Sequence, residues 1–280
     1  MIRRWDKSKP PTGPFALNSD CPQAQGLVAW WPIGMAGKNY AADFAGNNHA
    51  GLGVAASAMT LGDDGRPAIS LVAASNQYLA VPTCPKSAVP LTLTAWAKPP
   101  SGTQTVIYVG ATGGTRPEEH FCRIVLVSGY VRANFGGAGS QANAITTVAY
   151  TAGAWSLFSA SFTANNSRTV YLNGANAVTE TTSITPTAAF SRIRLGVAIT
   201  TSEALLQPLN GDLGECGIWN VALGPDMHSR LYDPGTRYEL WYPLRSRKWI
   251  VGAAATAPTI TALSAINITA TSAQPRISYS

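Results

Sequence analysis

Two pairs of acidic residues lie close enough in this sequence to raise the question of hydrolysis. Glycosidases use two carboxylates that flank the scissile bond, about 5 Å apart in retaining enzymes. Asp212 and Glu215 are three positions apart, and Glu118 and Glu119 are adjacent. Successive side chains on a strand point to opposite faces, so neither pair would share a face. The spacing therefore predicts no catalytic carboxylate pair.

Three histidines are the other candidates for chemistry. No G-x-S-x-G motif accompanies them, and no spacing suggests a zinc site. We expect His49, in an asparagine-rich turn, to make a structural hydrogen bond. We expect His120 and His228 at the surface, so the sequence predicts a protein that is not an enzyme.

The same asparagine-rich turn holds a cluster of oxygen donors. Asp43, Asn47 and Asn48 supply carboxylate and amide oxygens, which are calcium ligands. These side chains also cap turns by bonding nearby backbone groups. Both interpretations stay open: a calcium site, or a turn with no metal. No other cofactor is expected.

The composition is poor in charge and the basic residues gather near the ends. Only 12% of residues are charged, and the formal net charge is +6. This excess either solvates the ends or docks them on an acidic neighbour, such as a protein shell or a phosphate-rich glycan. The basic residues form no long run and no stacking motif, which argues against nucleic acid. No stretch is long and apolar enough for membrane insertion.

Short strand-like runs fill the sequence from residue 26 to about residue 233. The run "LTLTAW" alternates apolar and polar residues, and glycine, asparagine and proline clusters separate successive runs. This pattern predicts an all-β fold, a two-sheet antiparallel sandwich, with one short helix in "GPDMHSRLYD". The core residues that we expect to lose most of their exposure are Trp30, Leu93, Trp96, Phe158, Tyr171, Leu195 and Ile218.

The two ends differ from this body in composition and residue pattern. Residues 1–25 are proline-rich and predict an extended N-terminal arm. Residues 234–257 predict an arm and linker, and residues 258–280 alternate like a strand that pairs with another protein or another copy. The side chains expected at this assembly interface are Trp241, Tyr242, Arg245, Arg247, Trp249, Ile260, Leu263, Ile266 and Ile268.

The order of motifs resembles a LamG-like jelly roll of the concanavalin A-like lectin and glucanase fold. The motifs are "GLVAWWPI", "DFAGNNHAGLG", "NQYLAVP", the "YLNG" hairpin and the closing "LNGDLGECGIWNVALGPDMHSRLYD". The resemblance implies that calcium or sugar could be bound, since some members of this fold bind one or the other through loop acids. Gly214 stands where the closing motif has an aspartate, and Cys216 and Gly217 also depart from it, which weakens the transfer of either property.

The end of the chain resembles a second group of proteins. "YDPGTRYELWYPLRSRKW" and the strand-like segment after it are similar to the ends of LamG-type proteins of tailed bacteriophages and prophages. Because residues 1–14 lack a signal peptide's apolar stretch, we expect synthesis in the host cytoplasm. The resemblance implies a virion structural protein, a decoration of capsid or tail, with other virion proteins and its own copies as partners. The alternatives are a module that binds bacterial surface glycan, or a remote glycoside hydrolase.

Overall fold

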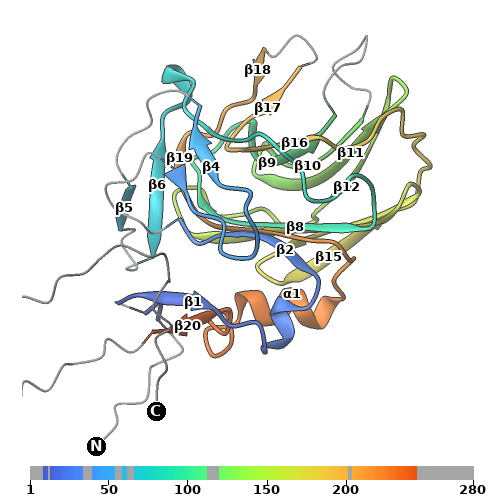
Figure 1. The fold of residues 1–280 in the computed structure, drawn as a ribbon. Coiled ribbons are helices and arrows are strands. Elements are labelled where there is room, and N and C mark those ends of the chain that lie inside the picture. Colours follow the sequence, from blue (N-terminus) through green and yellow to red (C-terminus); the bar gives the residue numbers. More distant parts are fainter. Residues whose placement is uncertain are drawn as a thin grey trace, which may run out of the picture. The chain divides into compact units, whose positions relative to one another are not determined.

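The structure is a computed structural model. It describes residues 9–11, 13–33, 40–53, 59–61, 66–111, 120–200 and 204–244. In this part of the chain two large antiparallel sheets pack face to face, as Figure 1 shows. The predicted all-β antiparallel sandwich is confirmed. Among the residues described, no helix is long and apolar enough to cross a membrane.

The first sheet, called sheet I here, has the spatial order β12-β11-β10-β9-β16-β7-β4-β3. All of its neighbouring strands are antiparallel. Its strands are β3 (Tyr40–Ala41), β4 (Ala50–Leu52), β7 (Leu79–Val81), β9 (Gln104–Gly110), β10 (His120–Val127), β11 (Tyr130–Gly137), β12 (Ser140–Ile145) and β16 (Arg192–Leu195).

The second sheet, sheet II, has the order β15-β14-β13-β8-β19-β6-β5, and β2 pairs with β19. Asn173 and Gly174, with φ of 55° and 69°, form the tight turn from β14 to β15 that the sequence predicts. The strands are β2 (Leu27–Trp31), β5 (Met59–Leu61), β6 (Pro67–Leu71), β8 (Leu91–Lys98), β13 (Ser156–Ala164), β14 (Ser167–Leu172), β15 (Ala175–Glu180) and β19 (Gly211–Trp219).

Several short elements complete the fold. The helix α1 (Pro225–Tyr232) begins at a proline, as predicted. Two short 3-10 helices are η1 (Pro22–Ala24) and η2 (Ala73–Ser75). Two small ribbons lie outside the large sheets, β1 (Phe15–Leu17) with β20 (Trp241–Pro243), and β17 (Ala198–Ile199) with β18 (Leu205–Leu206).

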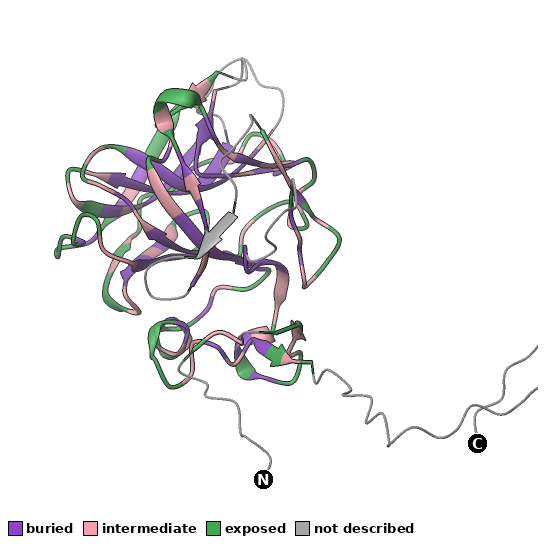
Figure 2. Cartoon of the chain, turned by 90° about the vertical axis from the view of Figure 1, so that its left-hand side faces the viewer, coloured by how far each residue is buried: buried purple, intermediate pink, exposed green. Residues whose placement is uncertain are grey.

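The main core lies between the two sheets. Leu93 and Phe158 of sheet II and Leu195 of sheet I belong to it, together with Ile218. The other predicted core residues are buried, but elsewhere: Trp30, Trp96 and Tyr171 lie on the opposite face of sheet II. Figure 2 shows this second layer of buried residues below the sandwich.

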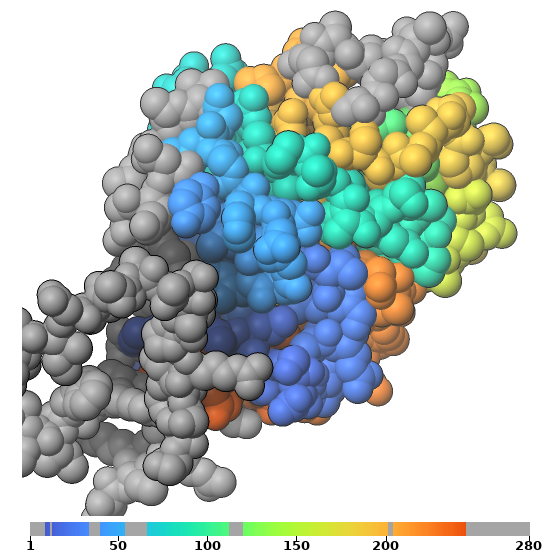
Figure 3. All heavy atoms as spheres, viewed as in Figure 1, coloured from blue at the N-terminus to red at the C-terminus, as the bar shows by residue number. Residues whose placement is uncertain are grey.

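Residues 13–25 and 223–244 cover that opposite face of sheet II, called the covered face here. Trp30, Trp96 and Trp219 of the sheet pack there against α1, the β1–β20 ribbon and residues near η1. In Figure 3 the blue N-terminal and the orange C-terminal residues meet below the sandwich. The folded body therefore includes residues 13–25 and 234–244, which the sequence placed in extended arms.

This difference has a physical cause. Prolines exclude a segment from the interior of a sheet, and they leave a short ribbon and apolar packing open to it. Phe15 packs on Trp241 with ring centroids 4.3 Å apart, and Cys21 is buried.

The other cysteines are Cys122 and Cys216, which are buried too, and Cys84, which is half-buried. All four cysteines are free thiols.

Candidate functional site

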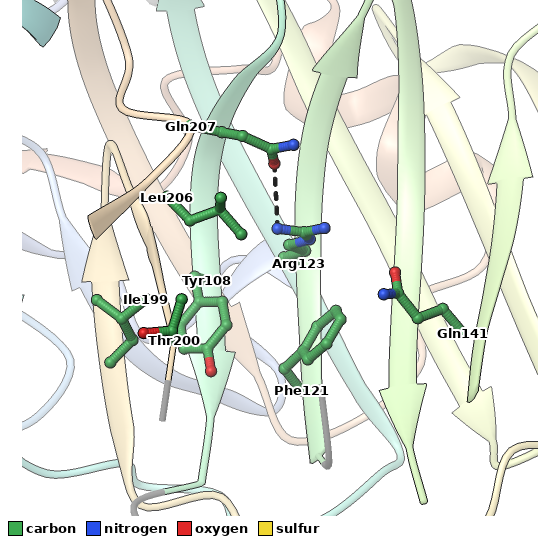
Figure 4. A pocket seen from close by; sticks show the side chains of 8 residues that line it. All are labelled: Tyr108, Phe121, Arg123, Gln141, Ile199, Thr200, Leu206 and Gln207. Atoms are coloured by element: carbon green, nitrogen blue, oxygen red, sulfur yellow. Dashed lines mark hydrogen bonds between the residues drawn. The ribbon is translucent and has the colours of Figure 1, made fainter. Parts of the chain in front are cut away.

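A pocket lies on the outward face of sheet I, the side away from the main core. Its volume is about 350 Å³. Side chains of β9, β10 and β12 form its floor, and the β17–β18 ribbon and the residue after it form a wall (Figure 4). The lining residues are Tyr108, Phe121, Arg123, Gln141, Ile199, Thr200, Leu206 and Gln207. This outward side of sheet I is called the pocket face.

Strand alternation puts these residues together. Val109, Cys122 and Ile124 point into the main core. Their neighbours Tyr108 and Phe121 must then point outward, because side chains alternate along a strand. The result is a face that carries aromatic and polar side chains without being part of the main core.

Two glycines let the aromatic rings lie along the sheet. A Cβ at Gly110 would overlap the end of the Tyr108 side chain, and one at Gly136 would overlap the Phe121 ring. Without these glycines neither ring could occupy its place. The two rings stack at an interplanar angle of 26°, with centroids 5.9 Å apart. They form a nearly parallel pair of flat apolar surfaces.

A chain of planar polar groups runs beside the rings. Arg123 donates from Nε to Asn134 Oδ1 (2.7 Å) and from Nη1 to Gln207 Oε1 (3.1 Å). Asn134 Nδ2 donates in turn to Gln141 Oε1 (3.2 Å). Arg123 also lies 5.0 Å from the centroid of the Phe121 ring. These bonds fix the guanidinium and amide planes, so the site is organised before any ligand arrives.

The wall of the pocket is anchored to the sheet. Gln207 has φ of 53°, a left-handed conformation that is uncommon for a residue with a side chain. Its backbone carbonyl accepts a hydrogen bond from Thr105 N at 2.7 Å, and its side chain bonds Arg123. Ile199 and Leu205 pack against Tyr108 and Phe121. Strained backbone held in this way is common at binding sites.

Sequence reasoning missed this site, although a signal was present. The runs "TVIYVG" and "FCRIV" predicted strands, and their second face was left without a role. That face carries Tyr108, Phe121 and Arg123, which suit neither an ordinary core nor a simple solvent-facing surface. Gln141 and Gln207 carried no signal, because tertiary folding alone brings them here.

The asparagine-rich turn is organised by the Asp43 carboxylate. Oδ1 accepts hydrogen bonds from the backbone N–H groups of Trp30, Ala45 and Gly46 at 2.8–3.1 Å. Oδ2 accepts from N and Nδ2 of Asn48 at 3.0 and 3.1 Å. Five donors converge on one carboxylate, an arrangement that matches the turn-capping interpretation. Asn47 takes no part in these hydrogen bonds, and the calcium interpretation stays a prediction.

Of the three predictions for the histidines, one is confirmed and two are wrong. His49 Nδ1 accepts a hydrogen bond from Asp43 N at 3.0 Å, so the expected structural bond is confirmed. His120 and His228 are buried, not at the surface. His120 stacks on Phe190 with centroids 4.2 Å apart. Burial lowers the pKa of both His120 and His228 to about 4.

His228 attaches α1 to sheet II. Its Nδ1 lies 2.9 Å from Ser159 Oγ and its Nε2 lies 2.9 Å from Ser161 Oγ, and its ring stacks on Tyr171. The sequence prediction failed because tertiary packing, not helix pattern, buries this side chain. A serine beside a histidine suggests a nucleophile, but this histidine has no exposed surface. The pair therefore serves the packing of the helix.

The pair Asp212 and Glu215 was predicted on opposite faces, and this was wrong. The register shifts between Leu213 and Cys216, and both of these residues point into the main core. This bulge leaves Asp212 and Glu215 on the same, outward side of β19. Asp212 accepts a hydrogen bond from Ser70.

Glu215 is used in the packing of the covered face. Its Oε1 accepts from the Trp30 indole at 2.7 Å, and its Oε2 accepts from the Trp241 indole at 3.4 Å. Burial raises the pKa of Glu215, and the Trp30 bond and the Arg66 charge oppose that rise. A carboxylate enclosed in this way has no route to a substrate.

The residues predicted at an assembly interface also differ in their outcome. Trp241 is only 2% exposed and belongs to the chain's own core on the covered face, so its assignment to an interface was wrong. Tyr242 is 57% exposed. The remainder of the set, Arg245, Arg247, Trp249, Ile260, Leu263, Ile266 and Ile268, lies outside the described residues.

A family profile identifies the sandwich. The model of the concanavalin A-like lectin/glucanases superfamily matches residues 73–227, more than half of the chain. The chain belongs to this superfamily. The match covers most strands of the superfamily sandwich, including β9, β10 and β12 of the pocket floor. No curated protein matches the sequence.

Solved structures show the same fold. Domain 4 of AbnA, a GH43 extracellular arabinanase from Geobacillus stearothermophilus solved with arabinotriose, is 20% identical, with a TM-score of 0.56 over 74% of this chain and 98% of that domain. The binding domain of Paraclostridial Mosquitocidal Protein 1 is 16% identical, with a TM-score of 0.55 over 75% of this chain and 52% of the other. Trypanosoma rangeli sialidase with sialic acid is 13% identical, with a TM-score of 0.52 over 74% of this chain and 33% of the sialidase.

Proposed function

We propose that this chain is a carbohydrate-binding module and that its site is the pocket on the pocket face. The observation that carries the proposal is the pair of flat rings, Tyr108 and Phe121, beside the bonded planar groups of Arg123, Gln141 and Gln207. A sugar has an apolar C–H face and a rim of hydroxyls. Aromatic rings suit the face, and guanidinium and amide groups suit the rim.

The chemistry of the lining supports binding without cleavage. Among the described residues that line the pocket there is no Asp, Glu, His or Cys. Hydrolysis of a glycosidic bond needs a proton donor and a second carboxylate. We therefore propose a module that is not an enzyme. Release of reducing sugar from a bound polysaccharide, lost on replacing Asp212 or Glu215, would contradict this.

The relatives support the carbohydrate class and leave the ligand open. The arabinanase domain was solved with arabinotriose, and the sialidase with sialic acid. These sugars differ in ring size and charge, and the identities are low. The pocket residues are therefore argued from this chain's geometry alone.

A panel of polysaccharides tests the proposal. The purified chain is run in affinity gels with arabinan, dextran, galactan, peptidoglycan fragments and bacterial lipopolysaccharide. We expect retention by at least one, and at least a tenfold loss of affinity in Tyr108→Ala and Gln141→Ala. Tyr242→Ala, on the β1–β20 ribbon, is the matched control and should bind normally. No retention by any glycan, or equal retention of all variants, would refute the proposal.

A second candidate function is attachment to a larger assembly, with the pocket displayed outward. The β1–β20 ribbon places Leu244 N 2.8 Å from Pro14 O, so both flanking segments begin side by side. The ribbon packs on the covered face of sheet II, and the pocket lies on the far side of sheet I. Pro14 and Leu244, the described residues next to these segments, thus lie on the side of the sandwich opposite the pocket.

The sequence resemblance suggests which assembly this is. We propose a virion of a tailed bacteriophage, in which the flanking segments contact other virion proteins and further copies, and the module binds host surface glycan. Deletion of residues 258–280 tests this attachment. The shortened chain should stay folded and bind glycan, and should be absent from purified particles. Normal incorporation would sink the attachment role and leave the glycan site untouched.

A further inference from the structure

One row of residues crosses the pocket face from edge to edge. Each member is paired in register with the next, on eight consecutive strands. Residues directly opposite each other in a sheet point to the same side. In order from β12 to β3 the row is Asn143, Asn134, Arg123, Tyr108, Arg194, Ala80, Gly51 and Tyr40.

The row changes character along its length. From β12 to β16 every member has a side chain with hydrogen-bond donors or acceptors. On β7 and β4 the row continues with Ala80 and Gly51, which offer none. The polar part therefore covers five strands, from Asn143 to Arg194. It includes Arg123 and Tyr108, two of the residues that line the pocket.

The pocket crosses the sheet beside this row, toward the edge of the sheet. It reaches from Tyr108 on β9 to Gln141 on β12, which is two residues from Asn143 and on the same face. Three interstrand spacings of about 4.8 Å give a length of about 14 Å. Such a length exceeds one sugar ring and suits a chain of about three.

The two ends of the pocket differ. At β9 the β17–β18 ribbon packs on Tyr108 and closes the site. In the described part of the chain, β12 is the edge strand of sheet I. On this strand Gln141 is exposed and Asn143 is half-buried. Figure 4 shows the ribbon on one side and Gln141 on the other. A ligand that enters can therefore continue over β12.

We propose that the ligand is a linear oligosaccharide laid across the strands. Its end lies under the β17–β18 ribbon against Tyr108 and Phe121, the following units cross β10 and β11, and the chain leaves over β12. Asn143 contacts a distal unit, beyond the reach of the terminal sugar. This inference rests on the proposed carbohydrate-binding function and adds the size and direction of the ligand.

Chain length is the test. Calorimetric titration uses linear arabino-oligosaccharides from one to six units, or the same series cut from whichever polysaccharide the panel identifies. We expect affinity to rise at least tenfold from one unit to three and then to level off. Asn143→Ala should weaken the trisaccharide at least fivefold and leave the monosaccharide unchanged, whereas Tyr108→Ala should weaken both. Tyr242→Ala is again the control.

The outcomes separate the two proposals. If the module binds a monosaccharide as tightly as a trisaccharide, or if Asn143→Ala changes no affinity, the extended ligand is refuted and carbohydrate binding stands. If no glycan of the panel is retained by the unaltered chain, both proposals fail.

Discussion

The outward faces of the two sheets both carry aromatic residues, but different parts of the chain pack over them. Sheet II carries Trp30, Trp96 and Trp219 on its covered face, and sheet I carries Tyr108 and Phe121 on its pocket face. Residues 13–25 and 223–244 pack over the tryptophans. Over the tyrosine and phenylalanine there is a two-stranded ribbon, with a pocket of about 350 Å³ beside it. Aromatic residues on an outward face therefore do not identify a binding surface by themselves.

The polar groups on the two faces follow this difference. On the covered face Glu215 is enclosed by two indoles, and His228 is held between two serines. Burying an ionisable group without such partners is costly. On the pocket face the polar groups bond one another and also line a cavity. Polar side chains thus complete the packing on one face and line an open cavity on the other.

The largest expected effect comes from opening the covered face. Trp241→Ala should cost about 3–5 kcal/mol of unfolding free energy, because it leaves a cavity and removes a donor from Glu215. Leu93→Ala in the main core should cost about 2–5 kcal/mol. Urea unfolding measures both. If Trp241→Ala unfolds like the unaltered chain, the terminal segments are not part of the cooperative fold.

Acid should destabilise the fold through its buried histidines. The pKa of His228 and His120 is lowered to about 4, so the fold holds them neutral. The contribution of these neutral histidines to the stability of the fold is complete above pH 6.5, the ordinary histidine pKa. It is lost as the pH falls toward 4, because the histidines of the unfolded chain bind protons at a higher pH than those of the folded chain. The loss is about 3 kcal/mol for each.

Urea unfolding at a series of pH values between 7 and 4 measures this loss. His228→Gln, which keeps a polar group between the two serines, should flatten the dependence by about half. An unchanged slope in this variant would show that His228 does not titrate as its burial implies.

A smaller effect is expected at the asparagine-rich turn. Asp43→Asn removes a carboxylate that accepts five hydrogen bonds and should cost about 1–3 kcal/mol. If the turn is organised without metal, the thermal midpoint stays the same with calcium or with chelator. A midpoint that rises with calcium in the unaltered chain and not in Asp43→Asn would establish the calcium site instead.

The smallest effect on stability is expected on the pocket face. Gln141 is exposed, so Gln141→Ala should change the unfolding free energy by no more than about 0.5 kcal/mol. The same change should lower glycan affinity at least tenfold. Trp241→Ala should show the reverse, with normal affinity wherever it is folded. If Gln141→Ala and Trp241→Ala change the unfolding free energy and the glycan affinity in the same way, the two faces do not differ in function as we propose.

The sequence predicted the sandwich well because alternation and turn residues are local signals. The strands around Leu93 and Phe158, the Asn173–Gly174 turn and the helix at Pro225 were all confirmed. Local signals do not say what covers a face, so the prolines near Phe15 wrongly suggested a free arm.

The candidate site was beyond local signals for the same reason. Gln207 reaches Arg123 across 84 positions of sequence, and no pattern in a single strand predicts that contact. The bulge near Gly214 put Asp212 and Glu215 on the same side of the strand instead of on opposite sides, since one extra residue breaks strict alternation. Burial of His228 likewise depends on the serines of β13, far from it in the chain.

Hydrogen exchange with and without the retained polysaccharide tests the central claim most directly. The claim is that carbohydrate binds on the pocket face of sheet I. We predict that protection from exchange increases in residues 104–110, 120–127 and 140–145, and that residues 13–25 and 225–244 on the covered face exchange at unchanged rates. Protection confined to the asparagine-rich turn at 43–49, or to the β1–β20 ribbon, would contradict the account.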